Sequence, residues 1–253
     1  RPVPPRKFRL PVEAPEAAQP GGEADARTED QTSEAEGTTI SDYHLNETSR
    51  QISISTTLLH CGWEGKKFNI LDAPGFLDFI GEARSALHIV DFALIAVPVV
   101  SGPEAGTDLV WKYAGERGIP KLIVVTMLNK EHSKFDTVMK ELMDHFSKRI
   151  FPFLLPMNAG PSFNQIADVL RRKMLTYRTD GSGKYEEGDL PDEWQDKVDQ
   201  LHEELIEYIA ESDDSLLKKF FDQGSLSEDE LRDGLHDAIQ NGTVIPLVCS
   251  AAD

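Results

Sequence analysis

The sequence is short of basic residues and cysteines, and it has no long hydrophobic run. Its 26 Lys and Arg are outnumbered by 44 Asp and Glu, giving a formal net charge of −18, which argues against broad electrostatic binding to DNA, RNA or an anionic membrane. No apolar run reaches the ~20 residues that a membrane helix needs, and residues 1–6 lack the apolar stretch of a secretory signal. We therefore expect a soluble protein with neither DNA nor a membrane as a partner.

Cysteine chemistry is also scarce. Cys61 and Cys249 are the only cysteines, and each lies beside an apolar strand pattern, so we expect two reduced, buried thiols and no disulfide. This favours a reducing compartment such as the cytoplasm. Neither the cysteines nor the histidines show the paired spacing of a zinc site, and no G-x-S-x-G hydrolase motif is present.

Two regions differ in composition. Residues 1–37 are rich in Pro, Ala, Glu, Gly, Thr and Ser, and we interpret them as a disordered leader or linker. Residues 38–253 show the pattern of a folded domain. It predicts a hairpin (51–59 and 67–71, with a turn at 63–66), helices at 80–89, 104–117 and 133–148, and strands at 92–100, 122–125 and 244–249.

The alternation of strands and helices predicts an α/β fold with a doubly wound, mostly parallel sheet whose ligand lies at the carboxyl ends of the strands. The strand at 92–100 is apolar on both faces, so we expect it to be fully buried. Residues of about 157–242 interrupt this rhythm as an acidic, helical α+β insertion. Within it, Leu201, Leu205 and Ile209 share a helical face, and residues 227–230 form a capping signal.

Residues 70–79 contain the most informative pattern. A hydrophobic strand ends in Asp72 and is followed by Pro74 and Gly75. An aspartate at a strand's carboxyl end can hold a Mg²⁺-bound water, and a glycine three residues later lets a backbone N–H approach a terminal phosphate. The pattern indicates a nucleotide site, whereas the plainer interpretation of Asp72 is a turn-capping residue.

The order of these segments resembles the GTPase domain of translation elongation factor G, and most closely the divergent elongation factor G-like proteins, over residues 37–251. Residues 37–44 with 50–54 resemble the first switch, residues 72–79 the second, and residues 156–174 with the acidic helices the G′ insertion. We call the first two the first-switch segment (37–54) and the second-switch segment (72–79). The resemblance implies a cytoplasmic, monomeric translational GTPase that uses GTP or GDP and Mg²⁺ and contacts the ribosome, including its stalk proteins.

The resemblance also implies a set of site residues. Magnesium would be held by Ser53 and Asp72, and the phosphates would lie at Asp72, Ala73, Pro74 and Gly75. The base would be recognised by Thr126, Met127, Leu128 and Asn129, together with Ser250 and Ala251. Three alternatives stay open: the base motif shifts to residues 129–132, Ser53 is one more polar residue of a Ser/Thr-rich strand, and Ser250 and Ala251 only cap a strand.

Departures from the family's pattern limit what the resemblance implies. No G-x-x-x-x-G-K-[ST] phosphate cradle occurs, and Gly183-Lys184 is followed by Tyr185. Asn129 replaces the carboxylate that binds guanine, and Met127 replaces the lysine that covers it. Phe76 occupies the position of the catalytic histidine and can neither orient nor deprotonate water. Two hypotheses result: a translational GTPase domain with impaired hydrolysis, or a nucleotide-free pseudo-GTPase scaffold that binds a protein partner.

Overall fold

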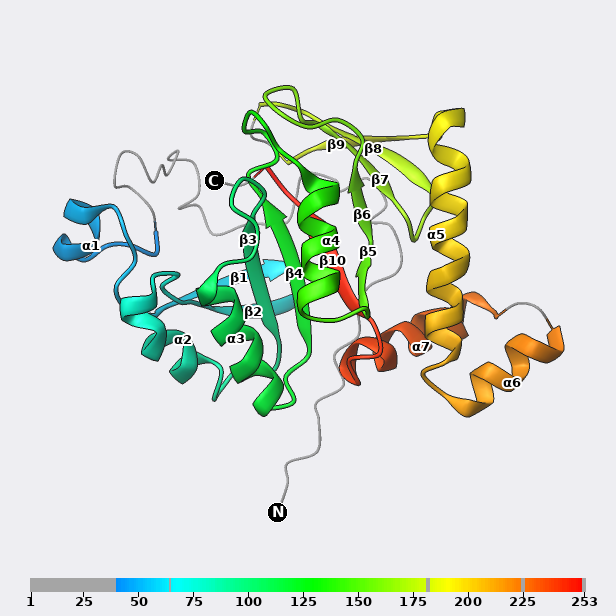
Figure 1. Cartoon of the computed structure of the whole chain (residues 1–253), viewed down its shortest axis with the longest axis horizontal. Coiled ribbons are helices and arrows are strands. Elements are labelled where there is room, and N and C mark those ends of the chain that lie inside the picture. Colours follow the sequence, from blue (N-terminus) through cyan, green and yellow to red (C-terminus); the bar gives the residue numbers. More distant parts are fainter. Residues whose placement is uncertain (1–39, 64, 181–182, 224–225, 252–253) are drawn as a thin grey trace, which may run out of the picture.

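The computed structural model describes residues 40–63, 65–180, 183–223 and 226–251 (Figure 1). The expected leader at 1–37, the start of the first-switch segment and part of the turn at 63–66 lie outside the described residues. The described chain forms three sheets, which are a hairpin, a parallel sheet and an antiparallel sheet.

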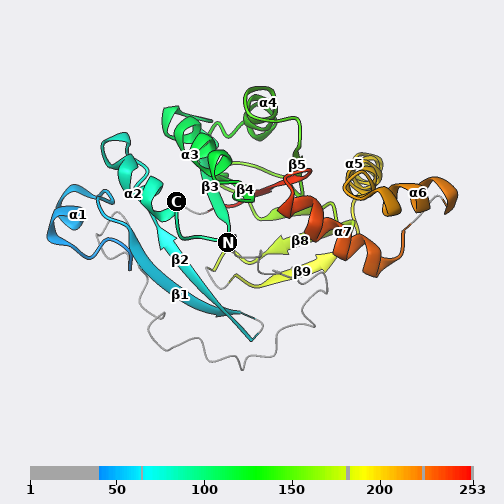
Figure 2. The ribbon, with the colours of Figure 1, turned by 90° about the horizontal axis from the view of Figure 1, so that it is seen from below.

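The parallel sheet forms the centre of the domain. Its order is β3 (Ala93–Pro98), β4 (Lys121–Thr126), β10 (Ile245–Cys249) and β5 (Ile150–Pro152), and each neighbouring pair is parallel. Helices α3 (Ala105–Glu116) and α4 (Phe135–His145) lie together on one face of it (Figure 2). The predicted α/β fold with a parallel sheet is confirmed.

Local sequence explains the helix limits and faces. Phe135, Val138 and Leu142 recur at helical spacing and are buried under α4. The predicted stop after α3 is present, because Gly118 adopts a left-handed φ of 64° and donates its N–H to the carbonyl of Gly115 at 3.0 Å. None of the helices within the described ranges is long and apolar enough to cross a membrane.

The hairpin pairs β1 (Thr57–Trp63) with β2 (Lys66–Asp72) and sets Thr57 opposite Asp72. It starts later than expected from residue 51. A short helix, α1 (Leu45–Arg50), precedes it, and the amides of residues 54–56 donate to carboxylates instead of to a partner strand. After β2 come a 3-10 turn, η2 (Leu77–Phe79), and helix α2 (Ile80–Ala86).

One face of β3 is exposed, so the expectation of a strand buried on both faces is wrong. Ile95 and Val97 point into the core, whereas Leu94 is 64% exposed. The reason is that α3 and α4 pack on a single face of the sheet.

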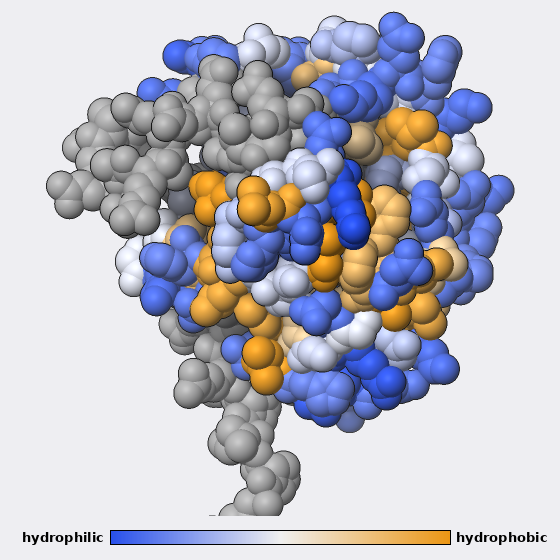
Figure 3. Space-filling model, turned by 90° about the vertical axis from the view of Figure 1, so that its left-hand side faces the viewer, coloured by the Kyte–Doolittle hydropathy of each residue, from blue (hydrophilic) through white to orange (hydrophobic). Residues whose placement is uncertain are grey.

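Further apolar side chains, including Leu45 and Leu58, are exposed on α1 and the hairpin. Figure 3 shows hydrophobic groups scattered over the side of the molecule that bears α1 and α2.

The insertion combines an antiparallel sheet with three helices. Its strands are β6 (Leu154–Pro156), β7 (Gln165–Asp168), β8 (Lys173–Tyr177) and β9 (Tyr185–Gly188), and its helices are α5 (Asp192–Ala210), α6 (Asp214–Gln223) and α7 (Glu228–Gln240). Phe153 links it to the core, since its N–H donates to Leu247 and its carbonyl accepts from Val169. The antiparallel sheet starts at Leu154, and the domain limits given above stay a prediction.

Two details of the insertion agree with its sequence. Leu205 and Ile209 of α5 are buried, with Leu201 packed beside them. Ser227 caps α7, with its hydroxyl accepting from the N–H of Glu230. The apolar spacing and the capping signal therefore had the expected local effect.

The two cysteines differ in environment. Both are free thiols, but Cys249 is buried in β10 and Cys61 is exposed on β1. The expectation of two buried thiols is wrong for Cys61, because β1 is exposed along most of its length.

Candidate functional site

Two of the predicted base-recognition segments meet at the carboxyl ends of adjacent strands. Thr126 ends β4, and Ser250 follows β10. The Leu128 N–H donates to the Ser250 carbonyl at 3.1 Å, and the Ser250 N–H donates to the Val125 carbonyl at 2.9 Å. We call residues 126–129 the base loop. Ala251 follows directly and is exposed.

Met127 and Leu128 anchor the base loop to the rest of the domain. Met127 takes a left-handed φ of 64°, which turns the chain, and its side chain packs against the main core. Leu128 is fully buried, and its carbonyl accepts from the Gly160 N–H at 2.8 Å. The loop is thus fixed to both the parallel sheet and the insertion.

The second-switch segment leaves the hairpin and packs on α3. Asp72 is the last residue of β2 and, like Ala73, is half-buried, while Pro74 is buried. A Cβ placed on Gly106 would lie 3.5 Å from the carbonyl oxygen of Gly75, so the turn sits closely against the first turn of α3. Phe76 then projects outward and is 55% exposed.

The first-switch segment is organised by a carboxylate that sequence reasoning missed. Glu47 is 1% exposed, and its carboxylate accepts the N–H groups of His44 at 3.2 Å and of Ile54 and Ser55 at 3.0 Å each. Burial alone would raise its pKa, but the hydrogen bonds from Ser55, Ile54 and His44 outweigh burial and hold the pKa below its ordinary value. The one local signal was the spacing of three between His44 and Glu47, as in a capping box.

A family model described as the elongation factor Tu GTP binding domain matches residues 21–253, which is most of the chain. The chain belongs to this GTP-binding domain family.

Relatives within this GTPase family agree with the resemblance to elongation factor G. The chain is 28% identical over 217 residues to elongation factor G of Thermotoga maritima, and 27% identical to that of Thermotoga neapolitana. Each match covers 86% of this chain and 31% of the relative. A Thermus thermophilus protein of known crystal structure matches with a TM-score of 0.81 and 30% identity, covering 88% of this chain and 33% of that one. The chain spans about a third of the length of these relatives.

The base end of this GTPase fold contains an unpaired acceptor. The side-chain oxygen Oδ1 of Asn129 is buried and has no hydrogen-bond partner within the described residues. A buried acceptor left without a donor costs about 1–3 kcal/mol. A donor such as a nucleobase N–H could satisfy it only after the loop opened, because the oxygen has almost no solvent-accessible surface in this structure.

The predicted magnesium site, Ser53 and Asp72, has fewer groups around it. Ser53 and Asp72 are both half-buried, and Thr57 opposite Asp72 links the two segments that contain them. No group of three or more His, Cys, Asp or Glu residues that could hold a metal occurs in the described ranges. Mg²⁺ is commonly bound by one or two protein ligands plus phosphate oxygens and water, and Ser53 and Asp72 would be the protein ligands here.

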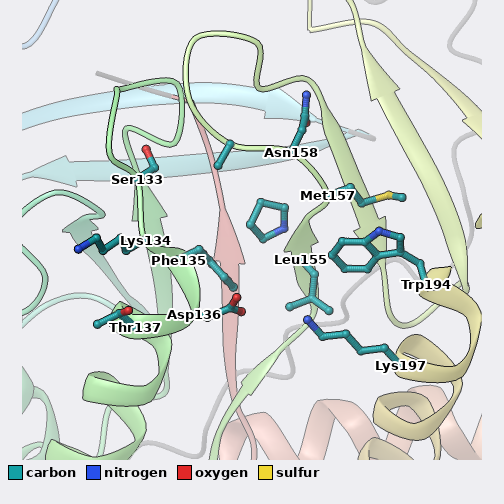
Figure 4. A pocket seen from close by; sticks show the side chains of 12 residues that line it. Ser133, Lys134, Phe135, Asp136, Thr137, Leu155, Met157, Asn158, Trp194 and Lys197 are labelled. Atoms are coloured by element: carbon teal, nitrogen blue, oxygen red, sulfur yellow. The ribbon is translucent and has the colours of Figure 1, made fainter.

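The predicted residues thus form two groups on different sheets. The base loop and Ser250 belong to the parallel sheet, and Asp72, Gly75 and Ser53 belong to the hairpin and its flanks. A cavity of about 340 Å³ lies beside the start of α4, between residues 133–137, residues 155–159, and Trp194 and Lys197 of α5 (Figure 4). None of the predicted contacts lines this cavity. The cavity adjoins the base loop, because Ser133, which lines the cavity, donates its hydroxyl to the Leu128 carbonyl.

Proposed function

We propose that this chain is the GTPase domain of an elongation factor G-like translation factor and binds a guanine-type nucleotide with Mg²⁺. The observation that supports it most is that the base loop and Ser250 are hydrogen-bonded to each other at the carboxyl ends of β4 and β10. The family assignment supports GTP or GDP as the ligand. By this proposal the domain acts on the ribosome, in the cytoplasm and as a monomer.

The residues have separate roles in this proposal. Asn129 accepts a base N–H, while the backbone at Ser250 and Ala251 lies against the other edge of the base. Asp72 holds a Mg²⁺-bound water, Ser53 contributes a hydroxyl, and the Gly75 N–H meets the terminal phosphate. Bound Mg²⁺ would neutralise phosphate charge. The 253 residues of this sequence contain no G-x-x-x-x-G-K-[ST] motif, so no residue is assigned to a phosphate cradle.

Hydrolysis should be impaired. The exposed Phe76 stands where the family resemblance implies a histidine, and its ring cannot take a proton from water. We therefore expect binding to survive better than turnover.

Isothermal titration with GTP, GDP and XTP in Mg²⁺ tests this function. The Asn129 amide can donate to the 2-oxo group of xanthine, so the chain should bind XTP more tightly than GTP. Asn129→Asp should reverse this preference by about tenfold or more, because a carboxylate accepts the two N–H groups of guanine. The absence of heat with all three nucleotides in both proteins would contradict the proposal.

The second candidate is a nucleotide-free pseudo-GTPase scaffold. It is favoured by Phe76, Met127 and Asn129, which stand where the family pattern has a histidine, a lysine and a carboxylate. Its partner would be a ribosomal stalk protein bound to the acidic helices α5 to α7. Binding of purified stalk protein that is unchanged by any nucleotide, together with silent titrations, would support the scaffold over the nucleotide-binding domain.

A further inference from the structure

A hydrogen bond joins residues that lie just after the two switch segments. Glu82 lies in the first turn of α2, the helix that follows the second-switch segment. Its Oε2 accepts the backbone N–H of Thr56 at 3.0 Å, across 26 positions of sequence. Thr56 lies two residues beyond the first-switch segment and directly before β1.

The position of Thr56 makes this bond consequential. Ser53 lies three residues before it, and Thr57, directly after it, is paired with Asp72. The Thr56 hydroxyl is buried and has no hydrogen-bond partner in the described part of the chain. The contact to α2 is therefore made by the backbone amide, and any residue with an N–H at position 56 would preserve it.

The same stretch is held from its other side. Glu47 accepts the amides of Ile54 and Ser55, and the Thr57 hydroxyl donates to the Ser41 carbonyl at 2.9 Å. Three consecutive amides, at positions 54 to 56, thus end on two carboxylates. The carboxylate of Glu82, from α2, can transmit a shift of the second-switch segment to the Thr56 amide.

We propose that Glu82 is a positioning residue that sets the spacing between Ser53 and Asp72 by holding the Thr56 amide to α2. Its role at a magnesium site rests on the proposed function, whereas the contact itself does not. A plainer role for Glu82 is to stabilise α2 by placing negative charge at the helix N-terminus.

Two substitutions separate these roles. Glu82→Asp keeps the charge near the helix N-terminus but is one methylene too short to reach Thr56. Glu82→Gln loses the charge but keeps an oxygen at the same reach, which can still accept the N–H. If Glu82 positions Thr56, Glu82→Asp should loosen the Thr56 amide and Glu82→Gln should not. If Glu82 acts only through its charge at the helix N-terminus, Glu82→Gln should be the more harmful substitution. Ser85→Ala is the control on the same helix, since the Ser85 hydroxyl donates to the Gly81 carbonyl of α2 itself.

The experiment is amide hydrogen exchange, detected by NMR, on the chain without nucleotide. In Glu82→Asp we expect the Thr56 amide to exchange about tenfold faster. In Glu82→Gln and Ser85→Ala it should stay within about threefold of the original, and the Leu128 amide should be unchanged in all of them. If the Thr56 amide does not exchange clearly faster in Glu82→Asp than in Glu82→Gln, the inference is overturned.

A second arm adds GTP or GDP with Mg²⁺ to the same samples. If the proposed function holds, nucleotide should slow exchange at residues 52–56 in the original chain, and less so in Glu82→Asp. If nucleotide changes nothing in the original chain, nucleotide binding is contradicted. The result of the first arm then still decides whether Glu82 positions Thr56.

Discussion

The base loop and the switch segments are held in place by different means. The base loop is fixed by backbone hydrogen bonds to neighbouring strands and by the fully buried Leu128. The end of the first-switch segment and the residues just after it are held by carboxylates, with Glu47 and Glu82 accepting amides from residues 54–56. Their outer side chains, Phe76 among them, are exposed.

This difference indicates where the domain can move. A loop that shares its backbone bonds with a parallel sheet opens only when the sheet opens, whereas a segment tied by a few side-chain acceptors can be released locally. We infer a rigid base end and an adjustable switch end. Three predictions test this contrast.

The largest difference is expected between the two thiols, since each region has one. Burial raises the pKa of Cys249 to about 12, and this residue is next to Ser250. At pH 8 a thiol with such a pKa is ionised in only about one molecule in ten thousand. Cys61 on the hairpin is exposed. A thiol reagent should therefore modify Cys61 first, with Cys249 at least about a thousandfold slower.

Peptide mapping by mass spectrometry after timed labelling measures this ratio. The folded Cys61→Ser chain should react only at the slow rate of Cys249, and denaturant should speed the reaction. Equal labelling of both thiols in the folded chain would contradict a rigid base end.

The next effect concerns global stability. Leu128→Ala removes a fully buried side chain below the base loop and should lower the free energy of unfolding by about 2–5 kcal/mol. Leu45→Ala in α1 is the matched control at the switch end, where the side chain is 86% exposed, and should change it by less than about 0.5 kcal/mol. Urea unfolding followed by circular dichroism provides both values. Similar losses in the two variants would mean that the switch end is as firmly packed as the base end.

The same contrast explains what the sequence could predict. The parallel sheet and its helices follow from local signals, such as the apolar runs of β3 and β4 and the stop at Gly118. The approach of the base loop to Ser250 follows from the rule that parallel strands end at one edge. These parts can be predicted because each depends on a short stretch of chain or on a general rule of sheet geometry.

The remainder depends on contacts between distant residues. Helix α1 has only six residues, which is too short for a periodic apolar pattern. The bond from Thr56 to Glu82 spans 26 positions and involves a backbone amide, which leaves no mark in the sequence. The exposure of Leu94 and Cys61 depends on which sheet faces the helices cover. The Asp72–Gly75 pattern and the family resemblance therefore identified the candidate residues but not what holds them.

The smallest effect is expected at Glu47 and depends on pH. Its folded-state pKa is lowered, so the ionised carboxylate stabilises the first-switch segment above about 4.3, the pKa of glutamate in an unfolded chain. This contribution is lost as the pH falls through the folded-state pKa. Protection of the Ile54 and Ser55 amides, corrected for intrinsic exchange, should fall by about threefold to tenfold between pH 5.5 and pH 3. The protection of the Leu128 amide should not fall over this pH range.

In Glu47→Gln the acid step should vanish and protection of the Ile54 and Ser55 amides should be low at every pH. The reason is that one carboxamide oxygen cannot replace two carboxylate oxygens that accept three amides. Gln is thus harmful at position 47 and tolerated at position 82, where a single oxygen is used. An acid step of unchanged size in Glu47→Gln would mean that Glu47 is not the titrating group.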